Sequence, residues 1–256
     1  MSDWHQRLGQ FQVAVMLLTR LPAGNLASPI PQLRDAVWAF PLVGAGVGAL
    51  CALGLALGAW VGLPPGVVAG VAVIIGVLAT GGLHEDGLAD LADGFGGGQT
   101  RARKLEIMRD SRIGSYGTLA LILAVGMRWQ ALAWVAAIGP ASAVCAIVAV
   151  AMISRAGLPA LMVALPAARD DGLGRTASGG DWTGAGVAAT IGLLAGVILL
   201  GPMAGIGVSV AAACALTALG AMAWHQIGGQ TGDVLGAGQQ ISEITAWLVL
   251  SAWVAP

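Results

Sequence analysis

The chain has 256 residues, of which 57% are apolar and only 10% are charged, and its formal net charge is −1. Soluble domains carry about 25% charged residues, and a protein of this size has too little interior to hide so much apolar surface from water. Its mean hydropathy of +0.83 points the same way. The composition therefore excludes a soluble or disordered chain, and the nearly balanced charge argues against a nucleic-acid partner.

The first predicted element lies in the N-terminal segment 1–35, where Trp4–Leu18 is largely apolar. With Arg7 and Arg20 bracketing it, this stretch is too short to cross a bilayer, which takes about 20 residues. We therefore expect a helix that lies along the membrane surface.

Seven apolar runs follow, and each is long enough, or nearly so, to form a transmembrane helix. They are approximately 36–62, 66–83, 118–138, 141–158, 183–200, 203–224 and 241–255. The sequence thus predicts an all-α, polytopic bundle of about seven membrane-spanning helices, within a range of six to eight. We expect residues 1–256 to form one membrane domain.

Two kinds of connection alternate between these runs. The charge-free turns are Pro64-Pro65, Gly139-Pro140 and Gly201-Pro202, and the polar segments are 1–35, 84–117, 155–181 and 226–240. All Lys and Arg residues except Arg128 lie in the polar segments. Because basic residues concentrate in cytoplasmic loops, the N-terminus and every polar segment are predicted to face the cytoplasm.

The acidic residues concentrate in one motif, residues 84–94, where Asp86, Asp90 and Asp93 stand at positions i, i+4 and i+7. On a helix these three side chains form a stripe about 60° wide. Carboxylates so close repel one another unless a cation lies between them, and hard oxygen ligands favour Mg²⁺. A solvated helix face is the alternative. The apolar residues between the aspartates and the lack of neutralising lysines favour the metal site.

Two further stretches of the polar segment 84–117 resemble parts of a phosphate site. The glycine-rich stretch 94–98 is followed by Arg101, Arg103 and Lys104, and both bare backbone N–H groups and guanidinium groups suit phosphate oxygens. Residues 110–117 place Asp110, Gly114 and Gly117 on one predicted helix face that could lie against the aspartates or a ligand. The alternatives are a flexible loop and a helix with small packing residues.

The segment 226–240 is predicted as a second site loop, because Asp233 stands there between glycines. It lies on the same predicted side of the membrane as the first motif and is therefore a candidate wall of the same cavity. Arg20 and Arg155 lie at span ends, where each could clamp a phosphate or simply anchor the cytoplasmic side.

Acids, arginines and glycines at a membrane surface favour metal-assisted phosphoryl transfer. One rival is a CDP-alcohol phosphatidyltransferase, but its Asp-Gly-x-x-Ala-Arg pattern is broken at Asp90. The other rival is a transporter of cations or solutes, which predicts ionisable residues at the bilayer midplane. Only Arg128 is expected at that depth, while the acids line one membrane surface.

Five motifs are specific enough to suggest a family. They are Leu18-Thr19-Arg20-Leu21-Pro22, Phe40-Pro41-Leu42-Val43-Gly44, residues 81–94, Arg109-Asp110-Ser111-Arg112-Ile113-Gly114 and residues 229–237. Over nearly its whole length the chain resembles the adenosylcobinamide-GDP ribazoletransferases, also called cobalamin or cobalamin-5′-phosphate synthases. Glu85 departs from the family pattern, in which an apolar residue is expected between the His and the Asp.

The resemblance implies that the substrates are adenosylcobinamide-GDP and α-ribazole, or α-ribazole 5′-phosphate, and that GMP is released. Asp86, Asp90 and Asp93 would hold Mg²⁺, while Asp110 or Asp233 would complete the metal site or accept a proton. The residues expected to hold phosphate or substrate are Arg20, Arg101, Arg103, Lys104, Ser111, Arg112, Arg155 and Thr231. The expected location is the bacterial cytoplasmic (inner) membrane, and a homo-oligomer is compatible with the sequence.

Overall fold

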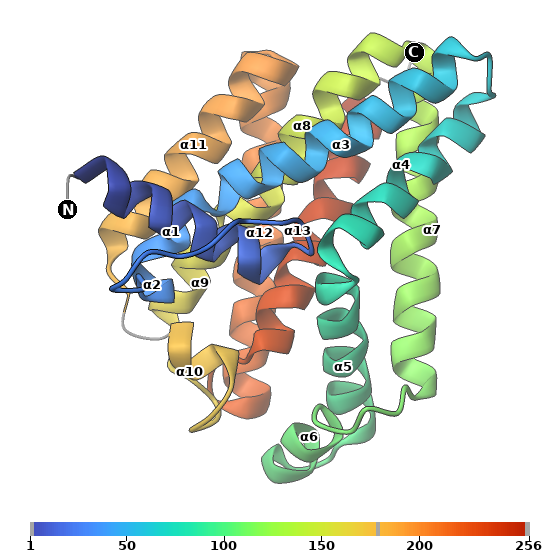
Figure 1. Cartoon of the computed structure of the whole chain (residues 1–256). Coiled ribbons are helices and arrows are strands. Elements are labelled where there is room, and N and C mark those ends of the chain that lie inside the picture. The colour runs from blue at the N-terminus through green and yellow to red at the C-terminus, as the bar shows by residue number, and fades with distance from the viewer. Residues whose placement is uncertain (1–2, 178–179, 254–256) are drawn as a thin grey trace.

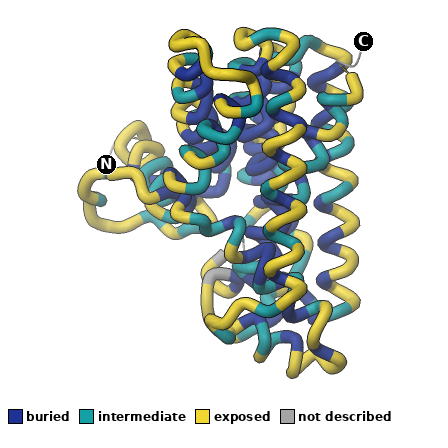
Figure 2. The backbone as a smooth tube through the Cα atoms, turned by 90° about the vertical axis from the view of Figure 1, so that its right-hand side faces the viewer, coloured by how far each residue is buried: buried dark blue, intermediate teal, exposed yellow. Residues whose placement is uncertain are grey.

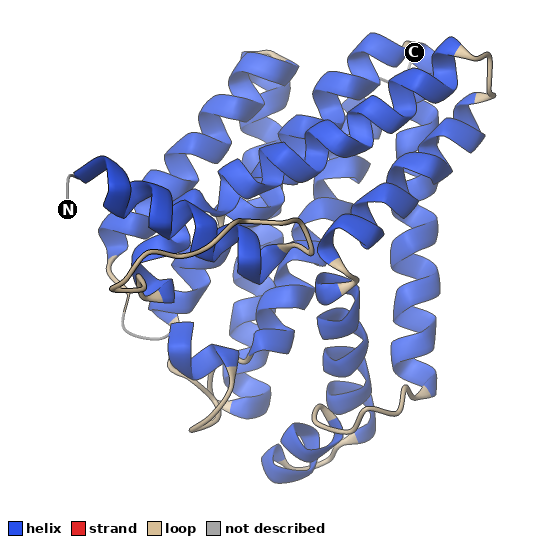
Figure 3. Ribbon diagram, in the orientation of Figure 1, coloured by secondary structure: helices blue, strands red, loops and turns tan. Residues whose placement is uncertain are grey.

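A computed structural model of the chain describes residues 3–177 and 180–253. Throughout these residues the regular elements are helices and none is a strand (Figure 3), which confirms the predicted all-α class. In chain order they are α1 (Asp3–Leu18), α2 (Leu33–Ala36), η1 (Val37–Ala39), α3 (Phe40–Trp60), α4 (Pro65–Thr80), α5 (Leu83–Gly97), α6 (Arg101–Ile107), α7 (Ser115–Ile138), α8 (Pro140–Ala156), α9 (Leu158–Ala164), α10 (Leu173–Ala177), α11 (Trp182–Leu200), α12 (Pro202–Ile227) and α13 (Gly232–Trp253).

The three charge-free turns lie together at one end of the bundle. The helices after them begin at Pro65, Pro140 and Pro202, where the fixed φ of proline suits the first helical turn and its missing N–H costs nothing. Figure 1 shows these turns at the top of the molecule and helices α6 and α10 at the opposite end. Parts of two predicted polar segments, 84–117 and 155–181, therefore lie at the end opposite the charge-free turns.

The number of apolar spans is smaller than seven in the described residues. Five helical stretches are long and apolar enough to cross a membrane, and a bent α4–α5 pair would make a sixth. They are residues 33–60, 115–138, 140–164, 182–200 and 202–227. The polytopic bundle is thus confirmed with five or six such stretches.

The predicted seventh run, 241–255, is only the C-terminal part of α13, and residues 254–255 lie outside the described chain. Because α13 already begins at Gly232, the predicted site loop 226–240 is mostly helix. This helix carries Asp233 and Glu243 and packs inside the bundle against α5 and α12, so internal contacts compensate for its lower hydropathy.

The predicted run 66–83 ends early, because two glycines break the helix. Gly81 and Gly82 have φ values of +67° and +72°, a left-handed conformation that glycine adopts without strain. The axes of α4 and α5 consequently differ by 87°. The side chain of Arg20 lies against this break, since a Cβ atom on Gly81 would lie 2.5 Å from Arg20 Nε.

The burial pattern supports a lipid environment. Figure 2 shows buried residues on the inward sides of the helices and exposed residues outward. The outward residues include large apolar side chains, such as Leu119, Ile122 and Leu123 on α7. Inside, α3 and α8 approach closely, because a Cβ atom on Gly44 would lie 2.3 Å from the carbonyl oxygen of Ala151. Small residues at such crossings are typical of membrane helix packing.

The predicted N-terminal surface helix is present as α1, which packs beside α2 and α3. Figure 1 shows it crossing the bundle at an angle to the long helix α7. Its exposed side includes Trp4, Leu8 and Met16. This apolar exposure is compatible with a helix at the membrane surface, although its depth in the bilayer stays a prediction.

Candidate active site

The site is built where α5 crosses α13 at a pair of glycines. A Cβ atom on Gly87 would lie 3.0 Å from the carbonyl oxygen of Asp233 and 3.1 Å from the Cα atom of Gly236. A Cβ atom on Gly236 would lie 3.2 Å from the Cα atom of Gly87. The absence of side chains at both positions lets the start of α13 lie directly against the acidic motif of α5.

This crossing creates a carboxylate cluster, which consists of Asp86, Asp90 and Asp233. Asp90 interacts electrostatically with both of the others and with Asp93, and Asp86 and Asp233 line one cavity of about 190 Å³. The nearest cation is Arg169, whose Nη1 lies 3.5 Å from Oδ2 of Asp233. Three carboxylates beside one guanidinium leave excess negative charge, which favours the binding of a further cation.

Asp93 has a different environment from the two preceding aspartates. It is buried, and its carboxylate oxygens accept hydrogen bonds from the backbone N–H groups of Gly114 at 2.7 Å and Gly117 at 2.9 Å. A Cβ atom on either glycine would lie 2.4 Å from an Asp93 oxygen. Asp93 thus satisfies free N–H groups at the start of α7 and neutralises its positive dipole end.

Two members of the predicted metal trio, Asp86 and Asp90, remain available to a magnesium ion, whereas both oxygens of Asp93 accept backbone N–H groups. In the described part of the chain, no three His, Cys, Asp or Glu side chains are arranged to hold a metal by themselves. Mg²⁺, however, is usually bound by one or two carboxylates together with water and substrate phosphates. Asp86 is exposed and Asp90 is half-buried one turn later, so both can contribute oxygens to such an ion.

Arg169 is a site residue that the sequence analysis missed. Backbone hydrogen bonds between its own loop and the loop before α13 hold it in place. The N–H of Ala168 donates to the carbonyl of Gln230 at 2.8 Å, and the N–H of Gln230 donates to the carbonyl of Pro166 at 2.8 Å. Nη2 of Arg169 also donates to the carbonyl of Leu105 at 3.0 Å. No motif or helical spacing joins Arg169 to Asp233, so only the folded chain could reveal this pair.

Asp110 lies in the loop before α7, so the predicted helix face that included it is wrong. The two glycines of that face do lie against the acidic motif, through Asp93. Asp110 instead pairs with Arg112, whose Nη2 donates to Oδ2 at 2.7 Å. The hydrogen bonds from Arg112 lower the pKa of the partly exposed Asp110 to about 2, which makes this carboxylate a weak base at neutral pH.

Two predicted phosphate-binding residues are already bonded to main-chain carbonyls. Arg101 donates from Nε to Ile227 at 2.7 Å and from Nη2 to Ala168 at 3.0 Å. The buried Lys104 donates from Nζ to the carbonyl of Gly98. These side chains hold α6 against α12 and close the glycine-rich end of α5.

The other predicted phosphate-binding residues at this end are placed differently. Four have exposed side chains: Arg20, Arg103, Ser111 and Arg112. Thr231, in contrast, is buried at the start of α13, where its hydroxyl donates to Asp233 at 3.2 Å and accepts from the N–H of Val234 at 3.3 Å. Thr231 therefore caps the helix and orients Asp233.

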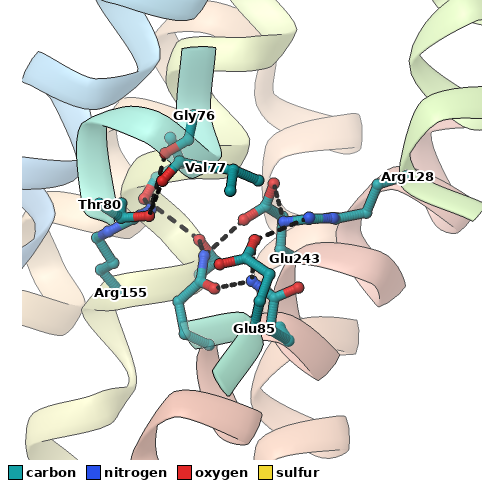
Figure 4. Close-up of polar contacts among 11 residues, drawn as sticks. Gly76, Val77, Thr80, Glu85, Arg128, Arg155 and Glu243 are labelled. Atoms are coloured by element: carbon teal, nitrogen blue, oxygen red, sulfur yellow. Dashed lines mark hydrogen bonds and ion pairs between the residues drawn. The ribbon is translucent and has the colours of Figure 1, made fainter. Parts of the chain in front are cut away.

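A second polar cluster lies inside the bundle, where the sequence predicted only one ionisable residue, Arg128 (Figure 4). We call it the buried polar network; its members are Glu85, Arg128, Ser154, Arg155, Gln239, Gln240 and Glu243. Nη2 of Arg128 lies 2.9 Å from Oε1 of Glu85, and its Nη1 lies 3.6 Å from Oε1 of Glu243. The expectation of a lone buried charge is thus wrong, and Glu85, the departure from the family pattern, is a partner of Arg128.

Arg155 belongs to this network rather than to an exposed span end. It is 3% exposed and donates to the carbonyl of Ala151 at 3.0 Å. The network surrounds a cavity of about 60 Å³ and leaves Nε of Arg128 and Nε of Arg155 without hydrogen-bond partners among the described residues. A cavity of this size has room for about two water molecules, which could satisfy these groups.

The chain is similar to a well-defined group of proteins. The sequence profile described as cobalamin-5-phosphate synthase matches residues 10–251. Adenosylcobinamide-GDP ribazoletransferases from Bradyrhizobium diazoefficiens and Mesorhizobium japonicum are each 43% identical to it, over 96% of this chain and 94% of their own. That of Azorhizobium caulinodans is 41% identical over 98% of this chain and 99% of its own. No solved structure matches the chain. The similarity therefore includes both helices that carry the carboxylate cluster.

Proposed function

Because the chain belongs to the cobalamin-5-phosphate synthase family, we propose that it transfers the cobinamide phosphate of adenosylcobinamide-GDP to α-ribazole or to α-ribazole 5′-phosphate. The match over residues 10–251 is the observation that carries this proposal. The carboxylate cluster supports it, since phosphoryl transfer depends chiefly on positioning the phosphates and neutralising their charge.

The proposed reaction replaces the anhydride oxygen that joins the two phosphorus atoms of the diphosphate with an ester oxygen from the acceptor. A ribose hydroxyl of the acceptor attacks the cobinamide-side phosphorus, the bond between that phosphorus and the GMP oxygen breaks, and GMP leaves with the electron pair. We assign the hydroxyl proton to Asp233, which lines the cavity and is oriented by Thr231. Asp110 is the weaker candidate because Arg112 lowers the pKa of its carboxylate.

We propose that Asp86 and Asp90 hold the magnesium ion. When bound there, Mg²⁺ would neutralise negative charge on the diphosphate. Arg169, held by Asp233 and Leu105, provides a fixed positive charge at the same place. Asp93 contributes by fixing the start of α7, and the exposed Arg20, Arg103, Ser111 and Arg112 remain candidates for contacts to the nucleotide.

The protein is a multi-pass membrane protein, as its five or six long apolar helices indicate. We propose the bacterial cytoplasmic membrane as its location, with the polar end and the carboxylate cluster facing the cytoplasm. The distribution of basic residues supports this orientation, because the charge-free turns lie at the other end.

Release of GMP from adenosylcobinamide-GDP by the purified protein in detergent tests the function. We expect release to require α-ribazole or its 5′-phosphate, to stop when EDTA removes divalent cations, and to return with Mg²⁺. Asp86→Asn and Asp90→Asn should each lower kcat about 100-fold or more, the effect of removing one electrostatic stabiliser of a transition state.

Asp35→Asn is the matched control, since Asp35 is an exposed acid on α2, and it should retain full activity. Undiminished GMP release in EDTA would contradict the metal assignment. Phosphoryl transfer to a diacylglycerol-type or alcohol-phosphate acceptor instead of α-ribazole would contradict the proposed reaction.

A further inference from the structure

The cavity next to the carboxylate cluster is mostly apolar. It has a volume of about 190 Å³ and lies between α1, α2, α3, α5, α9 and α13. Its apolar walls include Leu17, Phe40, Leu83, Leu158, Met162 and Leu235. Asp86 and Asp233 also line it, so a molecule within it would lie beside the residues to which we assign the reaction.

The size and chemistry of this cavity select among the parts of the two substrates. An apolar cavity of about 150 Å³ can hold benzene, so 190 Å³ suits a small aromatic ring system and is far too small for a corrin. Guanine is small enough, but its several hydrogen-bonding groups would lack partners on walls of Leu, Phe and Met, which is costly. The dimethylbenzimidazole base of α-ribazole is apolar except for one unsubstituted ring nitrogen.

One polar group lines this cavity without a hydrogen-bond partner. His84 is 3% exposed, and its Nε2 is buried and unpaired among the described residues. Buried polar groups of this kind nearly always have a partner. His84 also lines the smaller cavity of the buried polar network, so its ring lies between the two cavities, two residues before Asp86 in the chain.

We propose that this cavity binds the benzimidazole base of the acceptor, with His84 Nε2–H donating a hydrogen bond to the unsubstituted ring nitrogen. The base then lies among Phe40, Leu158 and Met162, and the ribose extends toward Asp233. This inference rests on the proposed function and adds to it the residues that select the acceptor.

The test compares α-ribazole with its indole counterpart, which has the same ring size but carries a C–H in place of the unsubstituted nitrogen. For His84→Leu, KM for α-ribazole should rise about fivefold to tenfold, the change that one neutral hydrogen bond supplies. KM for the indole riboside and KM for adenosylcobinamide-GDP should not change. His84→Gln, which keeps an N–H donor, should restore part of the affinity for α-ribazole.

The apolar wall is tested with Leu17→Trp, which fills part of the cavity and should raise KM for both acceptors but not for adenosylcobinamide-GDP. Leu119→Trp is the matched control, because Leu119 is 57% exposed on the outer side of α7, and it should leave every KM unchanged. Equilibrium dialysis of α-ribazole alone against the same variants measures acceptor binding without turnover.

Equal losses for both acceptors in His84→Leu would overturn the hydrogen bond, and a raised KM for adenosylcobinamide-GDP in Leu17→Trp would overturn the location. GMP release that is insensitive to both substitutions would refute the acceptor cavity and leave the proposed reaction intact. Binding of α-ribazole with the expected dependence on His84, but without GMP release, would refute the reaction and leave the cavity assignment intact.

Discussion

The three aspartates of α5 share a helix face but have different surroundings. Asp86 and Asp90 belong to the carboxylate cluster with Asp233, whereas both oxygens of Asp93 accept backbone N–H groups of the α7 N-terminus. Helical spacing places all three side chains on one side of α5. It cannot show what each side chain meets there, because the neighbours come from distant segments.

Asp93→Asn tests this difference. An amide retains one acceptor but turns an NH₂ group toward a backbone N–H, so we expect a loss of about 1–2 kcal/mol of stability, as for a lost helix cap, and a lower midpoint of thermal unfolding in detergent. Asp90→Asn should leave that midpoint unchanged or raise it, because it removes a crowded charge. Equal midpoints for the two variants would contradict the capping role of Asp93.

Arg128 is the residue on which the buried polar network depends, because it pairs with Glu85 and with Glu243. Arg128→Leu would leave both carboxylates without this partner inside the bundle and should cost about 3–5 kcal/mol. Glu85→Leu should cost less, since Arg128 keeps Glu243. Thermal unfolding of both variants in detergent compares their losses of stability, and a larger loss for Glu85→Leu than for Arg128→Leu would contradict this expectation.

Among the helices, the crossing of α5 and α13 decides whether the site exists. α5 brings Asp86 and Asp90, α13 brings Asp233, and their separation is limited only by the backbones at Gly87 and Gly236. The sequence showed glycines beside both acidic motifs. It could not show that the two glycines face each other.

Gly236→Ala should therefore reduce activity more than stability. Its new Cβ atom would lie 3.2 Å from the Cα atom of Gly87 and would push the helices apart by a few tenths of an ångström. A displacement approaching 1 Å at a reacting centre can cost about 100-fold in rate, so we expect kcat to fall about tenfold.

The control for this variant is Gly46→Ala, where the added Cβ atom would have no neighbour within 4 Å and kcat should be unchanged. A Gly236→Ala protein with the kcat of the unsubstituted protein would show that the close crossing is not needed for the reaction.

In the molecule as a whole, the two ends of the bundle differ in chemistry. Charge-free proline turns occupy one end, and the basic loops with α6 and α10 occupy the other. The orientation in the membrane determines which compartment each end faces.

Cysteine labelling in cells measures this orientation. In a chain whose three cysteines are replaced by alanine, Gln99→Cys at the polar end should react with an impermeant reagent only after the inner face is opened. Ser142→Cys, at the end with the charge-free turns, should react from outside. Both positions are exposed, and the reverse pattern would overturn the proposed topology.

The sequence by itself determined the lipid-facing helical fold, the alternation of connections between two ends, and the family. Each of these follows from local composition or from contiguous motifs. The tertiary structure decided the rest: the break of α4–α5, the pairing of Asp233 with Arg169, the capping role of Asp93 and the network around Arg128. These depend on contacts between residues that are far apart in the chain, and neither spacing nor hydropathy encodes which helix faces will meet.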